Sequence, residues 1–381
     1  MLKLISLLIG FIAAVSGTPL FGILANPFAP KFSTIQPSNP EITTAAACAP
    51  TSNYKDIEYV CGNVFDRIYI IFLENADYMK AVEDCHLKKL QKKGITLCNY
   101  WALTHTSEPN YIAAVGGDYY GLDTDDFVRL PERVFSIVDL LEYRNISWAE
   151  YQEHMPFTGY QGFEYKNQCN GANDYVRKHN PLIMYDSVTN NARRLSNIKN
   201  FTELYSDVAN RALPQWAFIT CNMSNGGHDT TVAKAGEWAY NFLDQLLVDE
   251  YCFHKTLLVL TFDEVDRNPK NRVLALLLGD IPCDLQNTVD ETYYDHYSLL
   301  SSVEANWDLP NLGRGDCGAN TFEVIARTTG YKNKQVDTRF KFNALSPPGW
   351  LAESFISIPP PDLNGQGAGG PILPEIARVW Q

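Results

Sequence analysis

The fold is decided by residues 67–73, which read RIYIIFL and run directly into Glu74 and Asn75. An unbroken run of apolar, β-branched and aromatic residues is typical of a strand that is buried on both faces. Residues 216–220 (WAFIT) and 256–262 (TLLVLTF) repeat this pattern. These three stretches predict the central strands of a sheet that is covered on both sides.

Further strands and helices alternate with these runs. Residues 95–100 and 272–278 also predict strands. Apolar residues at helical spacing predict helices at about 79–90, 135–143 and 230–246, with Asp229 or Thr230 as the cap of the last, and another helix opens at His296. Strands that alternate with helices indicate an α/β fold, with a mostly parallel central sheet sandwiched between helix layers.

Changes in composition divide the chain into four parts. Residues 1–17 have a positive start, an apolar run and a small-residue cleavage site, which predicts a secretory signal peptide. Residues 18–54, rich in proline, are expected to form an extended arm. Residues 55–343 read as one domain, within which the aromatic stretch 144–200 is expected to be loop-like decoration beside the substrate. The Pro- and Gly-rich tail, 344–381, is expected to be disordered.

The charge balance narrows the class of partner. The formal net charge is −13. Nucleic acids and anionic membranes recruit clustered Lys and Arg, so neither is expected as a partner, and no stable membrane association is expected. The balance suits a soluble protein in mildly acidic surroundings. Sequons at Asn145, Asn200 and Asn222 agree with a secreted, extracellular protein, free or bound to the cell wall. The oligomeric state is not set by the sequence.

Nine cysteines are scattered along the chain without a Cys-x-x-Cys pair. This spacing argues against a zinc knuckle or a redox motif. In an oxidising compartment it predicts several disulfides with one thiol left over. The sequence does not set the connectivity; Cys85 with Cys98, and Cys283 with Cys317, are the pairs we consider.

Acidic and amide side chains follow the predicted strands at their carboxyl ends. Glu74 and Asn75 end the first, and Asp263 and Glu264 end the strand at 256–262. Ligands gather at the carboxyl edge of the strands in open α/β sheets, so these residues are expected to converge. Either pair could also be ordinary turn residues. Crowded carboxylates are unfavourable without a cation among them, so the set predicts a site for a divalent metal ion.

A second polar stretch, THTSEPN at residues 104–110, follows the predicted strand at 95–100. A sharp turn before a helix holds a hydroxyl nucleophile in a fixed direction and offers backbone N–H groups to an anion. Ser107 is the candidate nucleophile, with Thr104 and Thr106 as other hydroxyls in the turn. Asn110, where the helix is expected to open, would donate to an oxygen of the substrate.

Histidines complete the predicted site. His228 lies in the loop after the strand at 216–220, and His179 precedes Asn-Pro. Either could neutralise anionic oxygens or protonate a leaving group, and either could instead be structural. His296, at the opening of a helix, is expected to pack or to cap.

Five motifs in order then resemble a known family. They are Phe72-Leu73-Glu74-Asn75, Thr104 to Tyr111, Arg177-Lys178-His179-Asn180-Pro181, Asn225-Gly226-Gly227-His228-Asp229 and Thr261-Phe262-Asp263-Glu264. Over about residues 55–340 the chain resembles the secreted fungal acid phosphatases of the phosphoesterase family, which also holds bacterial acid phosphatases and phospholipases C. Two departures are Gly226, where the family usually has an acid, and Thr106, where it often has proline.

The resemblance implies an alkaline-phosphatase-like fold and a phosphoseryl intermediate on Ser107. It further implies a metal site at Glu74, Asn75, Asp263 and Glu264, with His179 and His228 as catalytic histidines. The metal could be magnesium, calcium, manganese or zinc. We therefore predict a secreted, metal-dependent acid phosphatase that hydrolyses small phosphate monoesters and scavenges extracellular phosphate. The alternatives are a phospholipase C-type phosphodiesterase and an inactive surface or binding protein.

Overall fold

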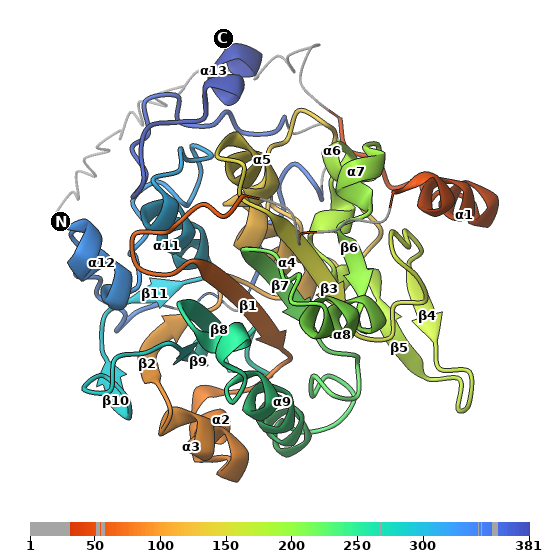
Figure 1. Cartoon of the computed structure of the whole chain (residues 1–381). Coiled ribbons are helices and arrows are strands. Elements are labelled where there is room, and N and C mark those ends of the chain that lie inside the picture. The colour runs from red at the N-terminus through yellow and green to blue at the C-terminus, as the bar shows by residue number, and fades with distance from the viewer. Residues whose placement is uncertain are drawn as a thin grey trace, which may run out of the picture.

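The computed structural model describes residues 31–50, 54, 58–266, 268–341, 343, 345–352 and 357–381. A nine-stranded sheet forms its centre, in the order β10-β2-β9-β8-β1-β7-β3-β6, with β11 paired to β2 (Figure 1). Its strands are β1 (Arg67–Leu73), β2 (Ile95–Trp101), β3 (Trp148–Gln152), β6 (Ile198–Asn200), β7 (Trp216–Thr220), β8 (Thr256–Phe262), β9 (Arg272–Gly279), β10 (Thr288–Asp290) and β11 (Tyr294–Asp295). The predicted signal peptide lies outside the described residues.

The sheet is mostly parallel, as the sequence predicts. β1 pairs in parallel with both β7 and β8, and all of its residues are buried. The exception is β9, which runs antiparallel to β8 and to β2. Because β9 reverses the direction twice, β2 points the same way as β1. The carboxyl ends of β1, β2, β7 and β8 therefore lie at one edge.

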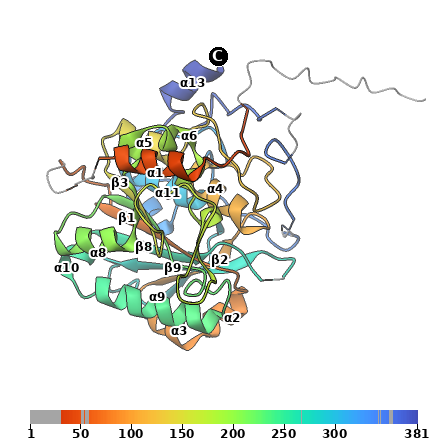
Figure 2. The same ribbon diagram turned by 90° about the vertical axis from the view of Figure 1, so that its right-hand side faces the viewer.

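Helices cover both faces of the sheet (Figures 1 and 2). α2 (Tyr78–Glu83), α3 (Cys85–Gln91) and α9 (Val232–Leu246) lie on one face, and α4 (Ser107–Gly116), α5 (Ile137–Tyr143) and α11 (Tyr297–Trp307) lie on the other. The remaining elements are α1 (Asn39–Cys48), β4 (Glu164–Lys166), β5 (Asn173–Val176), η1 (Arg177–His179), η2 (Leu182–Met184), α6 (Asp186–Thr189), α7 (Ala192–Leu195), α8 (Phe201–Ala209), α10 (Glu250–Phe253), α12 (Glu323–Thr329) and α13 (Pro374–Trp380). The α/β prediction is confirmed. Among the described residues, none of the helices combines the length and the apolar character needed to cross a membrane.

Two helix boundaries differ from the sequence prediction. The helix expected at 79–90 is two helices, because Asp84 caps α3 by accepting from the backbone N–H groups of His86 and Leu87. The cap of α9 is Thr231, whose hydroxyl accepts from the N–H of Lys234 at 3.3 Å. Local side-chain hydrogen bonds at the caps, which apolar spacing does not encode, set both boundaries.

The stretch 144–200 is not loop decoration, because β3 and β6 belong to the central sheet. β3 reads WAEYQ. Its polar residues Glu150 and Gln152 are buried, but they interrupt the apolar run that would predict a buried strand. Glu150 accepts from the N–H of Leu182 at 3.0 Å and from Nε2 of Gln152 at 2.8 Å. Since these buried polar groups have partners, the strand lies in the core without an apolar sequence.

Both terminal segments are more ordered than predicted. Residues 18–30 and 51–53 of the arm expected at 18–54 lie outside the residues that the structure describes. In the described part, α1 begins with a capping box between Ser38 and Glu41. The described part of the tail 344–381 ends in α13, and apolar side chains anchor it. These buried side chains are Trp350, Leu351, Ile358, Ile372, Leu373 and Ile376. A few large apolar residues among the prolines and glycines are enough to bind the described part of the tail to the core.

All nine cysteines are free in the structure. The pairs considered from the sequence, Cys85 with Cys98 and Cys283 with Cys317, are therefore not formed.

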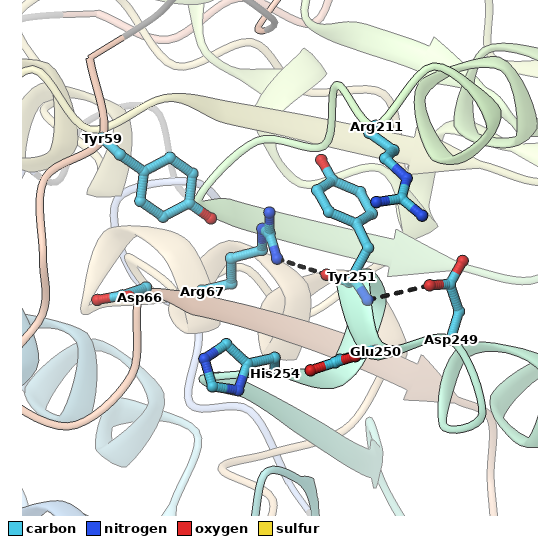
Figure 3. Close-up of a pocket in the computed structure, with 8 residues that line it drawn as sticks. All are labelled: Tyr59, Asp66, Arg67, Arg211, Asp249, Glu250, Tyr251 and His254. Carbon is cyan, nitrogen blue, oxygen red and sulfur yellow. Dashed lines mark hydrogen bonds between the residues drawn. The ribbon is translucent and has the colours of Figure 1, made fainter.

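Arg67, the first residue of β1, lies at the opposite edge of the sheet and has a structural role there. Its guanidinium packs against the rings of Tyr59 and Tyr251, at 5.3 and 4.4 Å, and Nη1 donates to the carbonyl of Tyr251 at 2.7 Å (Figure 3). A cavity of about 340 Å³ lies here, lined by Tyr59, Asp66, Arg67, Arg211, Asp249, Glu250, Tyr251 and His254. None of the predicted site residues lines this cavity, so it is separate from the candidate active site.

Candidate active site

The carboxyl ends of β1, β7 and β8 are joined by backbone hydrogen bonds. The N–H of Glu74 donates to the carbonyl of Gly226 at 2.9 Å, and the N–H of Asp263 donates to the carbonyl of Leu73 at 3.0 Å. The N–H of Ala76 donates to the carbonyl of Glu264 at 3.1 Å. These bonds bring Glu74, Asp263 and Glu264 to one place, at the sheet edge where the sequence expects them.

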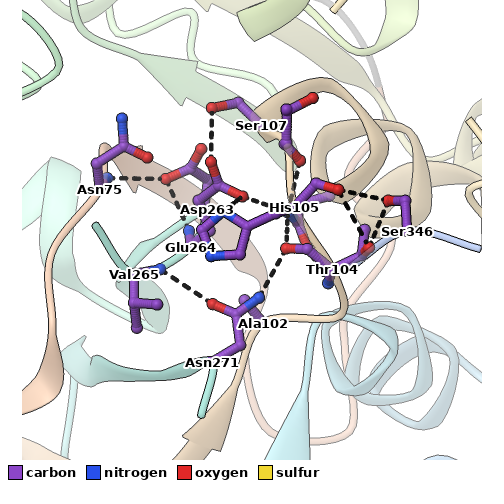
Figure 4. A network of polar contacts seen from close by, with 12 residues as sticks. Asn75, Ala102, Thr104, His105, Ser107, Asp263, Glu264, Val265, Asn271 and Ser346 are labelled. Carbon is purple, nitrogen blue, oxygen red and sulfur yellow. Dashed lines mark hydrogen bonds and ion pairs between the residues drawn. The ribbon is translucent and has the colours of Figure 1, made fainter. Parts of the chain in front are cut away.

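Ser107 is the first residue of α4 and is buried, and Figure 4 shows it next to Asp263 and Glu264. Its hydroxyl lies 3.4 Å from Oε2 of Glu74 and 3.3 Å from Oε1 of Glu264. The hydroxyl of Thr106 instead donates to Asp125 at 2.6 Å, and that of Thr104 bonds to Ser346. Of the three hydroxyls in the turn, that of Ser107 is therefore the one placed between the carboxylates.

Burial and crowding make negative charge on these acids unfavourable. Burial raises the pKa of Glu74 well above its usual range, and the charge of Asp263 adds to this rise. Burial likewise raises the pKa of Asp263, and it raises that of Glu264 to about 7 against the opposing hydrogen bond from His105. Crowding and burial thus both favour the binding of positive charge.

The residues present fit a divalent metal ion. Oδ1 of Asp263 accepts from the N–H groups of Asn75 and Glu264 at 3.1 and 2.7 Å, whereas its buried Oδ2 has no hydrogen-bond partner among the described residues. Nε2 of His179 is also buried and lies 3.2 Å from Oε2 of Glu74 without forming a hydrogen bond. Buried polar atoms without a partner are costly unless a ligand satisfies them. Hard oxygen donors of this kind suit a divalent cation.

The two predicted histidines lie next to each other, with ring centroids 5.7 Å apart. His179 is buried and stacks on Tyr111, which donates a hydrogen bond to Oε1 of Glu74. Burial and the charge of Lys178 lower the pKa of His179 well below its usual range, so it is neutral here. His228 is half-buried, with Nδ1 held 2.8 Å from Oδ1 of Asp229.

Asn110 has a different position from the one expected. It lies within α4, and its Oδ1 accepts from the N–H groups of Leu103 and Thr104 at 3.0 and 3.2 Å. Its Nδ2 donates to the carbonyls of Thr104 and Thr106 at 2.9 and 3.1 Å. The amide is buried, and Nδ2 also lies 3.4 Å from Oε2 of Glu264, so Asn110 holds the turn before Ser107 and contacts one of the acids of the site. The helix α4 also begins at Ser107, three residues before the start expected from the sequence at Asn110.

Comparison with known proteins identifies the family. The phosphoesterase family matches residues 76–310. This chain belongs to the phosphoesterase family. A probable acid phosphatase of Kluyveromyces lactis is 51% identical over 92% of this chain and 83% of its own length. Acid phosphatases of Aspergillus fumigatus and Aspergillus niger are 50% and 46% identical, over 80% and 88% of this chain and 68% and 82% of their own lengths.

Among solved structures, the phosphoesterase is similar to a protein in the alkaline phosphatase superfamily from Vibrio parahaemolyticus. The TM-score is 0.42 at 11% sequence identity, and the alignment covers 71% of this chain and 75% of the other. The predicted family and the prediction of an enzyme are confirmed by the family match and the curated relatives.

Sequence reasoning missed three polar residues of this phosphoesterase site. Nδ1 of His105 lies 2.7 Å from Oε2 of Glu264. Burial lowers the pKa of His105, but the hydrogen bond and charge of Glu264 outweigh it, so the pKa is raised. Lys178 and Asp125 form an ion pair at 2.8 Å beside His228. His105 and Lys178 stand inside the motifs quoted above, which was the available signal; Asp125 stands in none of them.

His296 packs beneath the site, in agreement with the packing role expected for it. Its Nε2 donates to the carbonyl of Asp263 at 2.7 Å, and its Nδ1 accepts from the hydroxyl of Tyr100 at 3.1 Å. Its ring lies 5.0 Å from that of Phe72, and burial lowers the pKa of His296 to about 4. A neutral imidazole thus fixes the backbone that carries Asp263.

Gly226, where the chain departs from the family pattern, packs closely against its neighbours. A Cβ at this position would lie 3.0 Å from Sγ of Cys221 and 3.2 Å from Cγ of Glu74. Any side chain here would therefore press on Glu74, so an acid would require its neighbours to shift.

Proposed function

We propose that this phosphoesterase is an acid phosphatase that transfers the phosphoryl group of a monoester to Ser107 and then to water. The main observation behind this proposal is the position of the Ser107 hydroxyl. It lies at the start of α4 and within 3.4 Å of two buried carboxylates. The names of the relatives that align over most of the chain support the same activity.

The proposed metal site consists of Glu74, Asn75, Asp263 and Glu264. A divalent cation bound there would lower the pKa of the Ser107 hydroxyl and polarise a phosphoryl oxygen. Asp263 offers its unpartnered Oδ2, and Glu74 and Glu264 offer oxygens next to Ser107. Asn75 is half-buried at a left-handed φ of 50°, which turns the chain sharply after β1.

In the first step, the oxygen of Ser107 forms a bond to phosphorus as the bond from phosphorus to the leaving oxygen breaks. Oxygens of Glu74 and Glu264 are the nearest acceptors for the proton of the hydroxyl. Backbone N–H groups at the start of α4 stabilise the charge on the phosphoryl oxygens. The half-buried His228 at the rim would donate a proton to the leaving oxygen. Water then attacks phosphorus, the bond from phosphorus to the oxygen of Ser107 breaks, inorganic phosphate leaves, and Ser107 regains its proton.

The proposal includes an extracellular location and glycosylation. Asn145 is exposed in the structure and is the sequon best placed for a glycan. Asn200 instead caps α8 by accepting from the N–H of Glu203 at 3.2 Å. Asn222 is buried, with Nδ2 3.1 Å from Nδ1 of His154. We therefore propose Asn145 as the glycan acceptor of the exported protein.

The test is an assay of the purified protein on p-nitrophenyl phosphate and on bis-p-nitrophenyl phosphate, before and after chelation. Ser107→Ala should lower kcat on the monoester by about 10⁴-fold or more. Thr104→Val is the matched control, because it removes a neighbouring hydroxyl that does not face the acids. Full activity in Ser107→Ala would overturn the proposal, and a preference for the bis-ester would favour the phosphodiesterase alternative.

A further inference from the structure

Lys178 carries a largely buried ammonium group at the candidate site. Its side chain is 15% exposed, and Nζ lies 2.8 Å from Oδ2 of Asp125 and 3.3 Å from Nε2 of His228. The residue immediately precedes His179 in η1. The sequence presents Lys178 only as part of a motif, and none of the roles proposed above uses it.

Asp125 connects this ammonium to the nucleophile. Its Oδ1 accepts from the hydroxyl of Thr106 at 2.6 Å and from the N–H of Glu108 at 3.0 Å, on the two sides of Ser107. Its Oδ2 accepts from Lys178. One carboxylate therefore fixes Lys178 relative to the turn that presents the Ser107 hydroxyl.

The ammonium has capacity left for a ligand. It carries three N–H donors; among the described residues one is donated to Asp125, and Nε2 of His228 is a neighbour at 3.3 Å. Burial lowers the pKa of Lys178, but the charge and the hydrogen bond of Asp125 oppose it, and the pKa is raised. An ammonium group that Asp125 holds against the turn carrying Ser107, with N–H donors beyond the one given to Asp125, is suited to bind an oxyanion.

We propose that Lys178 is a catalytic residue that donates to a non-bridging phosphoryl oxygen and gives the site its preference for monoesters, with Asp125 as its positioning residue. The inference rests on the proposed function and specifies its substrate class. A phosphate monoester carries up to two negative charges, with its second pKa near 6, whereas a diester carries one. An added cation therefore stabilises the monoester more.

The test compares Lys178→Met and Lys178→Arg with the wild-type protein on both p-nitrophenyl esters. Lys178→Met should lower kcat/KM on the monoester by about 10- to 100-fold, the range for one charged hydrogen bond, and should change kcat/KM on the bis-ester much less. Lys178→Arg should recover part of the monoester activity, because it keeps the charge. The inhibition constant of inorganic phosphate should rise in Lys178→Met in the same proportion.

Lys199→Met is the matched control for the structural cost. Lys199 forms a buried pair with Asp207 at 2.7 Å, on β6 and α8. Losing this pair should lower the unfolding temperature without altering the ratio between the two substrates. Equal losses on both esters in Lys178→Met, with unchanged inhibition by phosphate, would overturn the inference and leave Lys178 a structural residue.

The outcome is separable from that of the proposed function. If Ser107→Ala abolishes monoester hydrolysis while Lys178→Met leaves it unchanged, only the inference about Lys178 fails. If Ser107→Ala stays active, the proposed nucleophile fails whatever Lys178 does. If Lys178→Met does not fold, Lys178→Arg still tests the inference, because arginine alters the geometry of a direct contact. Unchanged kcat/KM on the monoester and an unchanged inhibition constant of phosphate in Lys178→Arg would contradict that contact.

Discussion

The hydroxyl of Ser107 lies 3.3 Å from Oε1 of Glu264, although the two residues are 157 positions apart in the chain. The pairing depends on the sheet: β8 lies next to β1, and β2 points in the same direction as both. The site is therefore a property of strand order.

Chelation should remove activity, because crowded acids with raised pKa values require a cation. Asp263→Asn replaces the unpartnered Oδ2 and should lower both the metal content and kcat. Metal analysis of the purified protein, with activity restored by magnesium, manganese, calcium or zinc, checks this expectation.

Asp84→Asn is the control for this variant. Among the described residues, Asp84, Cys85 and His86 form a compact group that could hold a metal ion, at the start of α3 and away from Ser107. Asparagine keeps the helix cap, so activity and metal content should stay unchanged. A loss of metal in Asp84→Asn but not in Asp263→Asn would show that the ion binds at the start of α3 and would contradict the proposed metal site at Ser107.

Asn110→Ala should damage both stability and turnover. The substitution removes the acceptor for the N–H groups of Leu103 and Thr104 and leaves them buried. Each such group costs about 1–3 kcal/mol. Denaturant unfolding measures the stability loss, and kcat should fall more than KM rises because the Ser107 turn loosens. A stable variant with normal kcat would show that Asn110 does not hold the turn.

Stability should be greater in mild acid than at neutral pH. Burial, together with the charge of Asp316, raises the pKa of Glu304 in α11 well above its usual range. The folded protein therefore binds a proton that the unfolded chain has released. The free energy of unfolding accordingly falls as pH rises above the unfolded pKa of about 4.3, by at most about 1.4 kcal/mol per pH unit for this group.

Glu304→Gln tests that assignment, because the amide has nearly the same size and keeps an N–H donor but does not titrate. Unfolding measured between pH 4 and pH 8 should show a shallower pH dependence than in the wild-type protein, with a gain in stability at pH 7. The same slope in both proteins would rule out Glu304 as a contributor.

The tail should contribute to global stability. Leu373 is 2% exposed, so Leu373→Ala should cost about 2–4 kcal/mol in denaturant unfolding. Val379→Ala, at a side chain that is 40% exposed in α13, should cost less than about 0.5 kcal/mol. Equal, small effects of the two substitutions would mean that the tail is detached from the core in solution.

Prediction from sequence was accurate where burial is uniform. β1 and β8 are apolar along their whole length, so their bounds and the acids that follow them could be inferred. β3 was missed because Glu150 and Gln152 are buried with hydrogen-bond partners, which a polar sequence does not reveal. The ion pair of Lys178 with Asp125 exists only after folding, as does the engagement of Asn110 within its own turn.

The most direct measurement is acid quenching of the enzyme during turnover of p-nitrophenyl phosphate, followed by peptide mass spectrometry. The account predicts one phosphoryl group on Ser107, absent from Ser107→Ala and from enzyme without substrate. A phosphoryl group on Thr104, Thr106 or a histidine, or steady turnover with no covalent phosphoryl-enzyme under any quench condition, would contradict it.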